Sequence, residues 1–175
     1  MATAERRRAC PEDNPVATIT LKRTVDTPIE RVWEVLSDFG GIHRFHPGVK
    51  SSPITDGTPS SGVGAERVCH LYDGNHLTER VTESVDQRKL AIDVVDSSMP
   101  MKTANGTFEV QTAADGKTEV SLTMAYKLKF GPLGAVMDKL VLEKSMTRSL
   151  DALLAGLDQH LTTGETIGEG WVPVA

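Results

Sequence analysis

Apolar and polar positions alternate along much of this chain, and the alternation predicts β-strands. In residues 18–25, Ile19, Leu21 and Val25 fall on one face, whereas threonines and a lysine fall on the other. The longest such segment is residues 119–130, in which every second residue from Val120 to Phe130 is apolar or aromatic. The pattern predicts seven strands: residues 18–25, 49–54, 65–71, 76–85, 90–96, 107–112 and 119–130.

Turn residues separate most of these strands by only a few positions. Asp73-Gly74-Asn75 is a strong hairpin signal, and Asp115-Gly116-Lys117 is a further turn. Pro53 inside the second predicted strand indicates an edge or a bulge there. Short connections between consecutive strands imply antiparallel pairing.

The apolar spacing changes to three and four residues on either side of the strand series, and this predicts helices. Asp26-Thr27-Pro28 is a typical helix start, and Ile29, Val32, Trp33 and Leu36 then repeat at helical spacing until Gly40-Gly41. A short turn or helix follows as far as Pro47. The long helix is predicted at residues 133–161 and would be about 40 Å long. Gly156 within it indicates close packing against another backbone, since glycine otherwise weakens a helix.

This order of elements predicts an α+β fold. We expect a curved seven-stranded antiparallel sheet around one long C-terminal helix, with two short helices after the first strand. A single helix about 10 Å across cannot fill the concave face of such a sheet. The sequence therefore predicts a hollow between sheet and helix, and we expect the functional site there.

Composition and charge limit the kinds of partner that this chain can bind. The 175 residues are 39% hydrophobic and 25% charged, which is enough for one domain with a core. A net charge of −5 argues against nucleic acid as a partner, and no segment is apolar enough to span a membrane. We expect a disordered tail at residues 1–15, a folded domain at 16–162 and a loose C-terminal tail at 163–175. The three arginines near the start leave a basic arm as the alternative for the first tail, and no apolar run follows them to make a secretory signal.

The cysteines and histidines show no pattern typical of a metal site or a disulfide. Cys10 and Cys69 are the only cysteines, and the five histidines are scattered. We therefore expect no metal, no cofactor and no disulfide, and a cytoplasmic protein that is a monomer or a weak homodimer.

Several motifs resemble those of a known family. They are the segment from Thr27 to Trp33, Asp38-Phe39-Gly40-Gly41 running to Phe45-His46-Pro47, the segment from Gly62 to Arg67, and Thr78-Glu79-Arg80-Val81. With the order of elements, they resemble the polyketide cyclase/dehydrase-like proteins of the START and Bet v 1 superfamily (SRPBCC), over residues 17–161. The resemblance implies a helix-grip fold, and members include lipid carriers, abscisic-acid receptors and aromatic-polyketide cyclases.

The receptors of that superfamily are similar to this chain from Gly64 to Val81. By that resemblance Cys69, Leu71 and Glu79 would face the cavity, and His46 would lie near the place of a lysine that binds the ligand carboxylate. The hairpin loop here is shorter than the receptors' gate loop, and Met99-Pro100-Met101 stands where they have a His-Arg-Leu latch. These two departures count against a hormone-gated receptor.

Glu79 is the main candidate for chemistry. It alternates with Leu77, Val81 and Val85, so the pattern places it on the buried face. A carboxylate there would have a raised pKa, and it could move protons or bind a polar group of a ligand. The alternative is a carboxylate at the solvated rim or paired with an arginine such as Arg67.

The register of the hairpin decides which residues share the face of Glu79. A three-residue loop places Arg67, Cys69 and Leu71 there, whereas a two-residue loop places Val68 and His70 there. The resemblance favours the first.

The remaining candidates each have an ordinary structural alternative. His46 could be a polar group at the cavity mouth or a histidine bonded to a loop carbonyl. Tyr126 could offer its hydroxyl to a ligand or bond to a neighbouring strand, and Cys69 is expected to be a small buried residue. Lys144 lies on a helix face expected to be solvated but could turn towards the sheet. The methionines could line an adaptable pocket or simply fill the core.

Three functions fit these observations. The first is binding or transport of a small, mostly apolar or amphipathic molecule, lipid or polyketide-like, anchored by Glu79, His46 and Tyr126. The second is a polyketide cyclase, dehydratase or isomerase in which Glu79 moves protons and His46 or Tyr126 polarises a carbonyl. The third is a protein-interaction module. The predicted lining of the cavity comprises His46, Cys69, Leu71, Leu77, Glu79, Val81, Ile92, Val94, Met99, Met101, Phe108, Met124, Tyr126, Leu128, Met137, Leu140, Val141 and Lys144.

Overall fold

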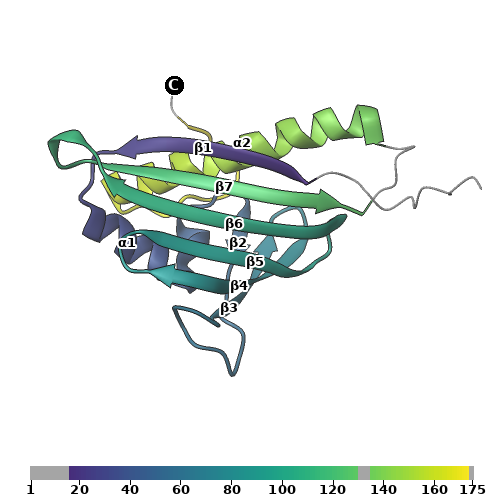
Figure 1. Ribbon diagram of the computed structural model, residues 1–175, viewed down its shortest axis with the longest axis horizontal. Helices are drawn as coiled ribbons and strands as arrows, with labels where there is room; N and C mark the ends of the chain where they lie inside the picture. The colour runs from purple at the N-terminus through teal and green to yellow at the C-terminus, as the bar shows by residue number, and fades with distance from the viewer. Residues whose placement is uncertain (1–15, 130–134, 174–175) are drawn as a thin grey trace, which may run out of the picture.

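The computed structural model describes residues 16–129 and 135–173, and the side chains of these residues other than 135–142. Figure 1 shows a single curved sheet with helices on its inner side. The elements in chain order are β1 (Ala17–Val25), α1 (Ile29–Ser37), the 3-10 helix η1 (Phe39–Arg44), β2 (Val49–Ser51), β3 (Glu66–Leu71), β4 (His76–Val85), β5 (Lys89–Ser97), β6 (Met101–Thr112), the 3-10 turn η2 (Ala114–Gly116), β7 (Thr118–Leu128) and α2 (Ala135–Thr163).

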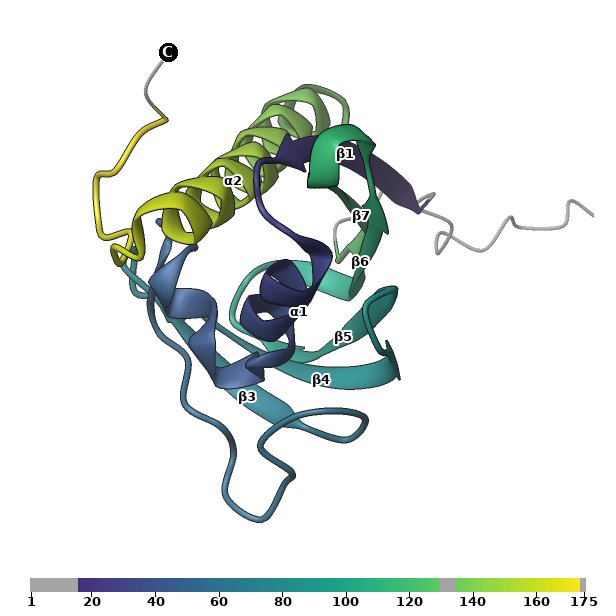
Figure 2. The ribbon, with the colours of Figure 1, turned by 90° about the vertical axis from the view of Figure 1, so that its left-hand side faces the viewer.

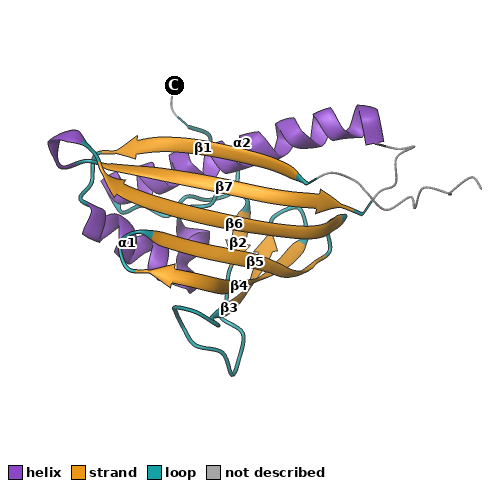
Figure 3. Ribbon diagram, in the orientation of Figure 1, coloured by secondary structure: helices purple, strands orange, loops and turns teal. Residues whose placement is uncertain are grey.

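The sheet is antiparallel throughout, in the order β1-β7-β6-β5-β4-β3-β2. Consecutive strands from β2 to β7 are neighbours because short turns join most of them, whereas β1 pairs with β7 at the far end. Seen from the side, the sheet curls around α1, and α2 lies across its open side (Figure 2). Colouring by secondary structure shows the same division between the strands and the helices (Figure 3). The predicted α+β fold is confirmed.

Two strands differ from the prediction in length. The second strand ends at Ser51 instead of residue 54, because Pro53 lacks the N–H that a continuing ladder needs; Ile54 keeps only an isolated bridge to Arg67. Conversely, β6 begins at Met101 rather than at residue 107 and pairs with β7 along its whole length. The predicted strand end at Phe130 and the predicted helix start at residue 133 lie outside the described residues.

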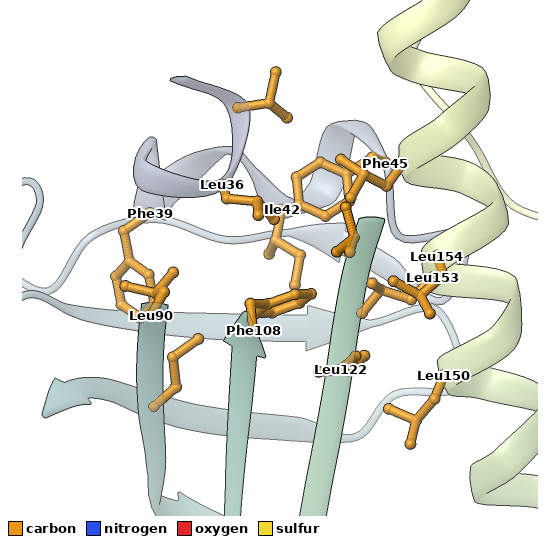
Figure 4. Close-up of a cluster of buried hydrophobic side chains, with 14 of the residues drawn as sticks. Leu36, Phe39, Ile42, Phe45, Leu90, Phe108, Leu122, Leu150, Leu153 and Leu154 are labelled. Atoms are coloured by element: carbon orange, nitrogen blue, oxygen red, sulfur yellow. The ribbon is translucent and has the colours of Figure 1, made fainter. Parts of the chain in front are cut away.

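A cluster of large apolar side chains joins the sheet, α2 and the α1–η1 segment (Figure 4). Leu150, Leu153 and Leu154 of α2 approach the strands from one side, and Phe108 and Leu122 come from the sheet. The segment from α1 to Phe45 closes the cluster from above with apolar residues that are almost fully buried: Leu36, Phe39, Ile42 and Phe45. This cluster forms one end wall of the hollow.

The close approach predicted at Gly156 is present. A Cβ atom at this position would lie 2.2 Å from the carbonyl oxygen of Phe45, so only glycine lets α2 reach the end of η1. The chain after α2 then packs on the same segment: Ile167 is 3% exposed, and its N–H donates to the Arg44 carbonyl over 2.8 Å. The prediction of a loose C-terminal tail is therefore wrong for this part of the chain. Among the described residues, no helix is long and apolar enough to cross a membrane.

Candidate functional site

A cavity of about 350 Å³ lies between the concave face of the sheet and α2. Its volume falls within the range of small-molecule sites. Most of its wall is apolar. The described residues that line it are Ile42, His46, Gly48, Val49, Arg67, Cys69, Leu71, Tyr72, Asp73, Leu77, Glu79, Ile92, Val94, Met99, Met101, Gly106, Phe108, Leu122, Met124, Met146, Ser149, Leu150 and Leu153.

Gly106 provides part of this space. It lies in the middle of β6, paired with Ile92 on one side and Met124 on the other, and all three line the cavity. A Cβ atom at Gly106 would meet nothing within 4 Å, and the backbone there is not in the left-handed region. A side chain at this position would therefore point into empty space, which makes Gly106 the natural position at which to fill the cavity.

The polar part of the wall is built on an ion pair between adjacent strands. Arg67 and Glu79 are direct partners in the β3–β4 ladder and face the cavity together. The Nη2 and Nε atoms of Arg67 approach Oε2 of Glu79 at 2.6 and 2.7 Å, and the two side chains are 4% and 13% exposed. The observed register is the one given by a three-residue loop, so Cys69 and Leu71 share this face and His70 is exposed on the other.

Arg67 is also held from the other side. Its Nη1 donates to the Phe39 carbonyl over 2.6 Å, and its guanidinium lies 4.1 Å from the centre of the Phe39 ring. A guanidinium fixed by a carboxylate, a carbonyl and an aromatic face cannot easily turn towards another anion. Both alternatives considered for Glu79 are thus combined: the carboxylate is paired with Arg67 and also lines the cavity.

Cys69 contributes a thiol that is not reactive. The side chain is buried, and its Sγ donates to Oε2 of Glu79 over 3.4 Å. Burial, and next the negative charge of Glu79, raise the pKa of the Cys69 thiol far above its usual range. Since the thiolate is the nucleophile, Cys69 is a packing residue with a weak hydrogen bond.

His46 lies at the edge of the cavity on the turn that precedes β2. Its Nδ1 accepts the N–H of Gly48 over 3.0 Å. Burial lowers the pKa of His46 to about 4; the Glu79 carboxylate opposes this and Arg67 adds to it. The ring is therefore neutral near pH 7, and because Nδ1 is an acceptor, the proton must be on Nε2. His46 can offer a hydrogen-bond donor, but no positive charge.

Most of the predicted lining residues reach the cavity, and four do not. Val81 is buried in the hydrophobic core, and Leu128 packs against this core. Tyr126 is also buried outside the cavity, and burial followed by the charge of Glu143 raises the pKa of its hydroxyl. Lys144 is exposed and belongs to a separate pocket on the outside of α2. The side chains of Met137, Leu140 and Val141 lie outside the described residues.

The part of α2 that closes the cavity was not predicted correctly. Ser149, Leu150 and Leu153 line the cavity and lie further along the helix than the predicted positions. Met146 also lines it and is one of the methionines for which a pocket was considered. The helical repeat marks an apolar face, but it does not say which turn of that face crosses the hollow. Gly106 was missed as well, since an isolated glycine in a strand has several possible causes. Among the residues that the structure describes, no group of histidine, cysteine or carboxylate side chains could hold a metal ion.

Similarity to solved structures extends over most of the chain but at low identity. An aromatase/cyclase called Zhui from Streptomyces sp. R1128 is 20% identical, with a TM-score of 0.72, over 85% of this chain and 94% of that one. TTHA0849 from Thermus thermophilus is also 20% identical, with a TM-score of 0.71, over 85% and 99%. Ara h 8.0201 is 12% identical, with a TM-score of 0.66, over 85% and 99%. At such identities the likeness establishes the fold alone.

The sequence itself also matches a family. No curated protein sequence is similar enough to count as a match. Residues 16–162, however, match the family described as polyketide cyclase/dehydrase and lipid transport, and they contain every element of the sheet and nearly all of α2. This chain therefore belongs to the polyketide cyclase/dehydrase and lipid transport family.

Proposed function

We propose that this chain binds or carries a small, mostly apolar molecule, lipid or polyketide-like, in the cavity between the sheet and α2. The observation that carries the proposal is a cavity of about 350 Å³ with an apolar wall and a few polar groups gathered at Glu79, Arg67 and His46. Apolar surface supplies most of the affinity in such sites, and a few polar groups fix the orientation. The family description, which includes lipid transport, is consistent with this function.

Native mass spectrometry before and after denaturation tests the proposal. We expect a small molecule to be released on unfolding, or, if the purified protein is empty, to be taken up from a panel of lipids and aromatic ketones. Gly106→Leu should abolish this binding because the new side chain enters the cavity. Asn105→Leu is the matched control, since it adds the same side chain to an exposed position of the same strand. Equal binding by both variants, or no binding to the unaltered protein, would contradict the proposal.

A cyclase, dehydratase or isomerase is the second candidate, and one feature favours it. Among the described residues, the hydrogen bonds of the Glu79 carboxylate fall on Oε2, and Nε2 of His46 has no hydrogen-bond partner. The free Oε1 could accept a proton from a substrate while the neutral imidazole donates a hydrogen bond to a carbonyl oxygen. Glu79→Gln should then abolish turnover of such a substrate without abolishing binding, and turnover that persists would exclude this mechanism.

An interaction module has less support. The exposed large apolar side chains of the described residues come from separate segments: Val16, Val63, Tyr72, Val85, Val95 and Val172. Docking surfaces more often gather such residues in one patch.

A further inference from the structure

The charges in the cavity wall limit what kind of molecule can bind, provided that the proposed function is right. Among the described residues that line the cavity, Arg67 is the one that carries a positive charge, and Glu79 and Asp73 carry negative charges. Asp73 is exposed on the hairpin loop at the mouth, where hydrogen bonds from Asn75 lower the pKa of its carboxyl. The described wall therefore has no excess of positive charge to offer an anion.

The positive charge of the one guanidinium is already balanced by Glu79. All three nitrogen atoms of Arg67 have partners: Nε and Nη2 contact Glu79, and Nη1 contacts the Phe39 carbonyl. These contacts use three of the five N–H groups of the guanidinium. The negative charge of Glu79 already balances the positive charge of Arg67, so a ligand carboxylate bound to the remaining two N–H groups would lie close to a second carboxylate. Burying an anion without a cation is strongly unfavourable, so such a ligand should bind weakly.

Beside Arg67, the polar corner formed by Glu79 and His46 has two atoms without a hydrogen-bond partner among the described residues, and they are of opposite kinds. Oε1 of Glu79 has no partner among the described residues and can only accept a hydrogen bond while the carboxylate is ionised. The Nε2 of His46 carries a proton and can donate one. Both residues line the same cavity, and the charge of Glu79 acts on the His46 ring by opposing the effect of burial on its pKa. The polar corner thus has one acceptor beside one donor.

We propose that the natural ligand is a neutral, largely apolar molecule with a hydroxyl group for Glu79 and a carbonyl group for His46, and that the site rejects carboxylic acids such as free fatty acids. The apolar walls bind the body of the molecule, and the polar corner selects its functional groups. Mismatched buried polar groups are a strong basis for discrimination, since each one left unpaired weakens binding.

A matched series of naphthalenes tests this proposal by isothermal titration calorimetry at pH 7. The series comprises acetylnaphthol with both groups, acetylnaphthalene without the hydroxyl, naphthol without the carbonyl, and hydroxynaphthoic acid with a carboxylate in place of the ketone. We expect acetylnaphthol to bind tightest, and the acid to bind at least about tenfold more weakly. Equal or tighter binding of the acid would overturn the proposal.

Glu79→Gln should largely abolish this selectivity. The substitution removes the negative charge and frees the guanidinium of Arg67, so hydroxynaphthoic acid should gain about tenfold in affinity relative to acetylnaphthol. Glu66→Gln is the matched control: Glu66 pairs with Arg80 on the opposite face of the same two strands, and it should leave the selectivity unchanged. If Glu79→Gln did not fold, the selectivity of the unaltered protein would still decide the proposal.

The outcomes separate this inference from the proposed function. If the naphthalenes bind, Gly106→Leu blocks them, and the acid binds as well as the ketone, the cavity is a binding site but the inference about its polar corner is wrong. If lipids of the panel bind but no naphthalene does, this inference fails alone. If nothing in the panel binds, or if Gly106→Leu has no effect on binding, the proposed function fails and this inference fails with it.

Discussion

Replacing Arg67 by methionine should destabilise the protein strongly. The change removes the contacts of 2.6 and 2.7 Å to Glu79, the hydrogen bond to the Phe39 carbonyl and the packing over the Phe39 ring. It leaves a carboxylate that is only 13% exposed without its counter-ion. Breaking a buried ion pair in this way typically costs about 3–5 kcal/mol. Since the cavity lets water approach Glu79, we expect a value near the lower end, about 3 kcal/mol.

The double variant Arg67→Met/Glu79→Leu shows whether the loss comes from the uncompensated charge. Removing both charges leaves an apolar pair at this position, so its free energy of unfolding should return to within about 1–2 kcal/mol of the unaltered protein. The pair Glu66–Arg80 on the outer face of the same strands serves as a comparison. Glu66 is also 13% exposed, but Arg80 is 52% exposed, whereas Arg67 is 4% exposed and also contacts Phe39, so Arg80→Met should cost less than Arg67→Met.

Urea denaturation followed by tryptophan fluorescence measures these differences, because Trp33 is 8% exposed in the folded protein. In thermal unfolding, about 3 kcal/mol corresponds to a lowering of Tm by roughly 6–12 °C for a chain of this length. The reasoning is refuted if Arg67→Met costs no more than Arg80→Met, or if the effects of the two substitutions at the pair simply add.

Three further predictions concern single residues near the site. Because burial lowers the pKa of His46 from 6.5 to about 4, the unfolded state binds more protons than the folded state between these values. This difference should lower the free energy of unfolding by about 3 kcal/mol from neutral pH to about pH 4, with no contribution from His46 above neutrality. In urea titrations at a series of pH values, the His46→Gln variant should lack this decrease. Cys69 should resist iodoacetamide in the folded protein at neutral pH and react only after denaturation, as peptide mass mapping can show. Labelling of Cys69 in the folded protein would contradict its description as a buried packing residue. Gly156→Ala should lower the free energy of unfolding by about 1–3 kcal/mol, because the new Cβ meets the Phe45 carbonyl. Gly106→Ala should leave the free energy of unfolding unchanged or raise it, because its Cβ meets nothing. Equal denaturation midpoints for these two variants would contradict the packing described.

The fold could be predicted from the sequence because burial on one face leaves a repeat that can be counted. In β7, the apolar residues at every second position all lie on the concave face, as the alternation requires. The burial of Ile167 could not be predicted in this way, because a single apolar residue in a polar segment forms no repeat. The predicted location in the cell and the predicted oligomeric state stay predictions.

The candidate site could be predicted only in part. Glu79 was found because alternation within its own strand places it on the buried face, whereas the position of Cys69 depended on the hairpin register, which only the family resemblance favoured. The position of α2 over the hollow depends on how the helix crosses the sheet, so Ser149 and Leu153 could not be identified from their spacing. Tyr126 shows the opposite limit: it lies on the predicted face and is buried, but it does not line the cavity, because alternation marks the face of a strand and not how far the cavity extends over that face.

The most direct test of the account is to locate the bound molecule by NMR, using ¹⁵N-labelled protein titrated with acetylnaphthol. We predict that the largest shifts in amide signals fall on the strands and the helix turns around the cavity, including Gly106, Cys69 and Leu150. Gly106→Leu should abolish these shifts. Shifts confined to the outer pocket of α2 around Lys144 and Arg148, or to scattered exposed residues, would contradict the claim that the hollow between sheet and helix is the binding site.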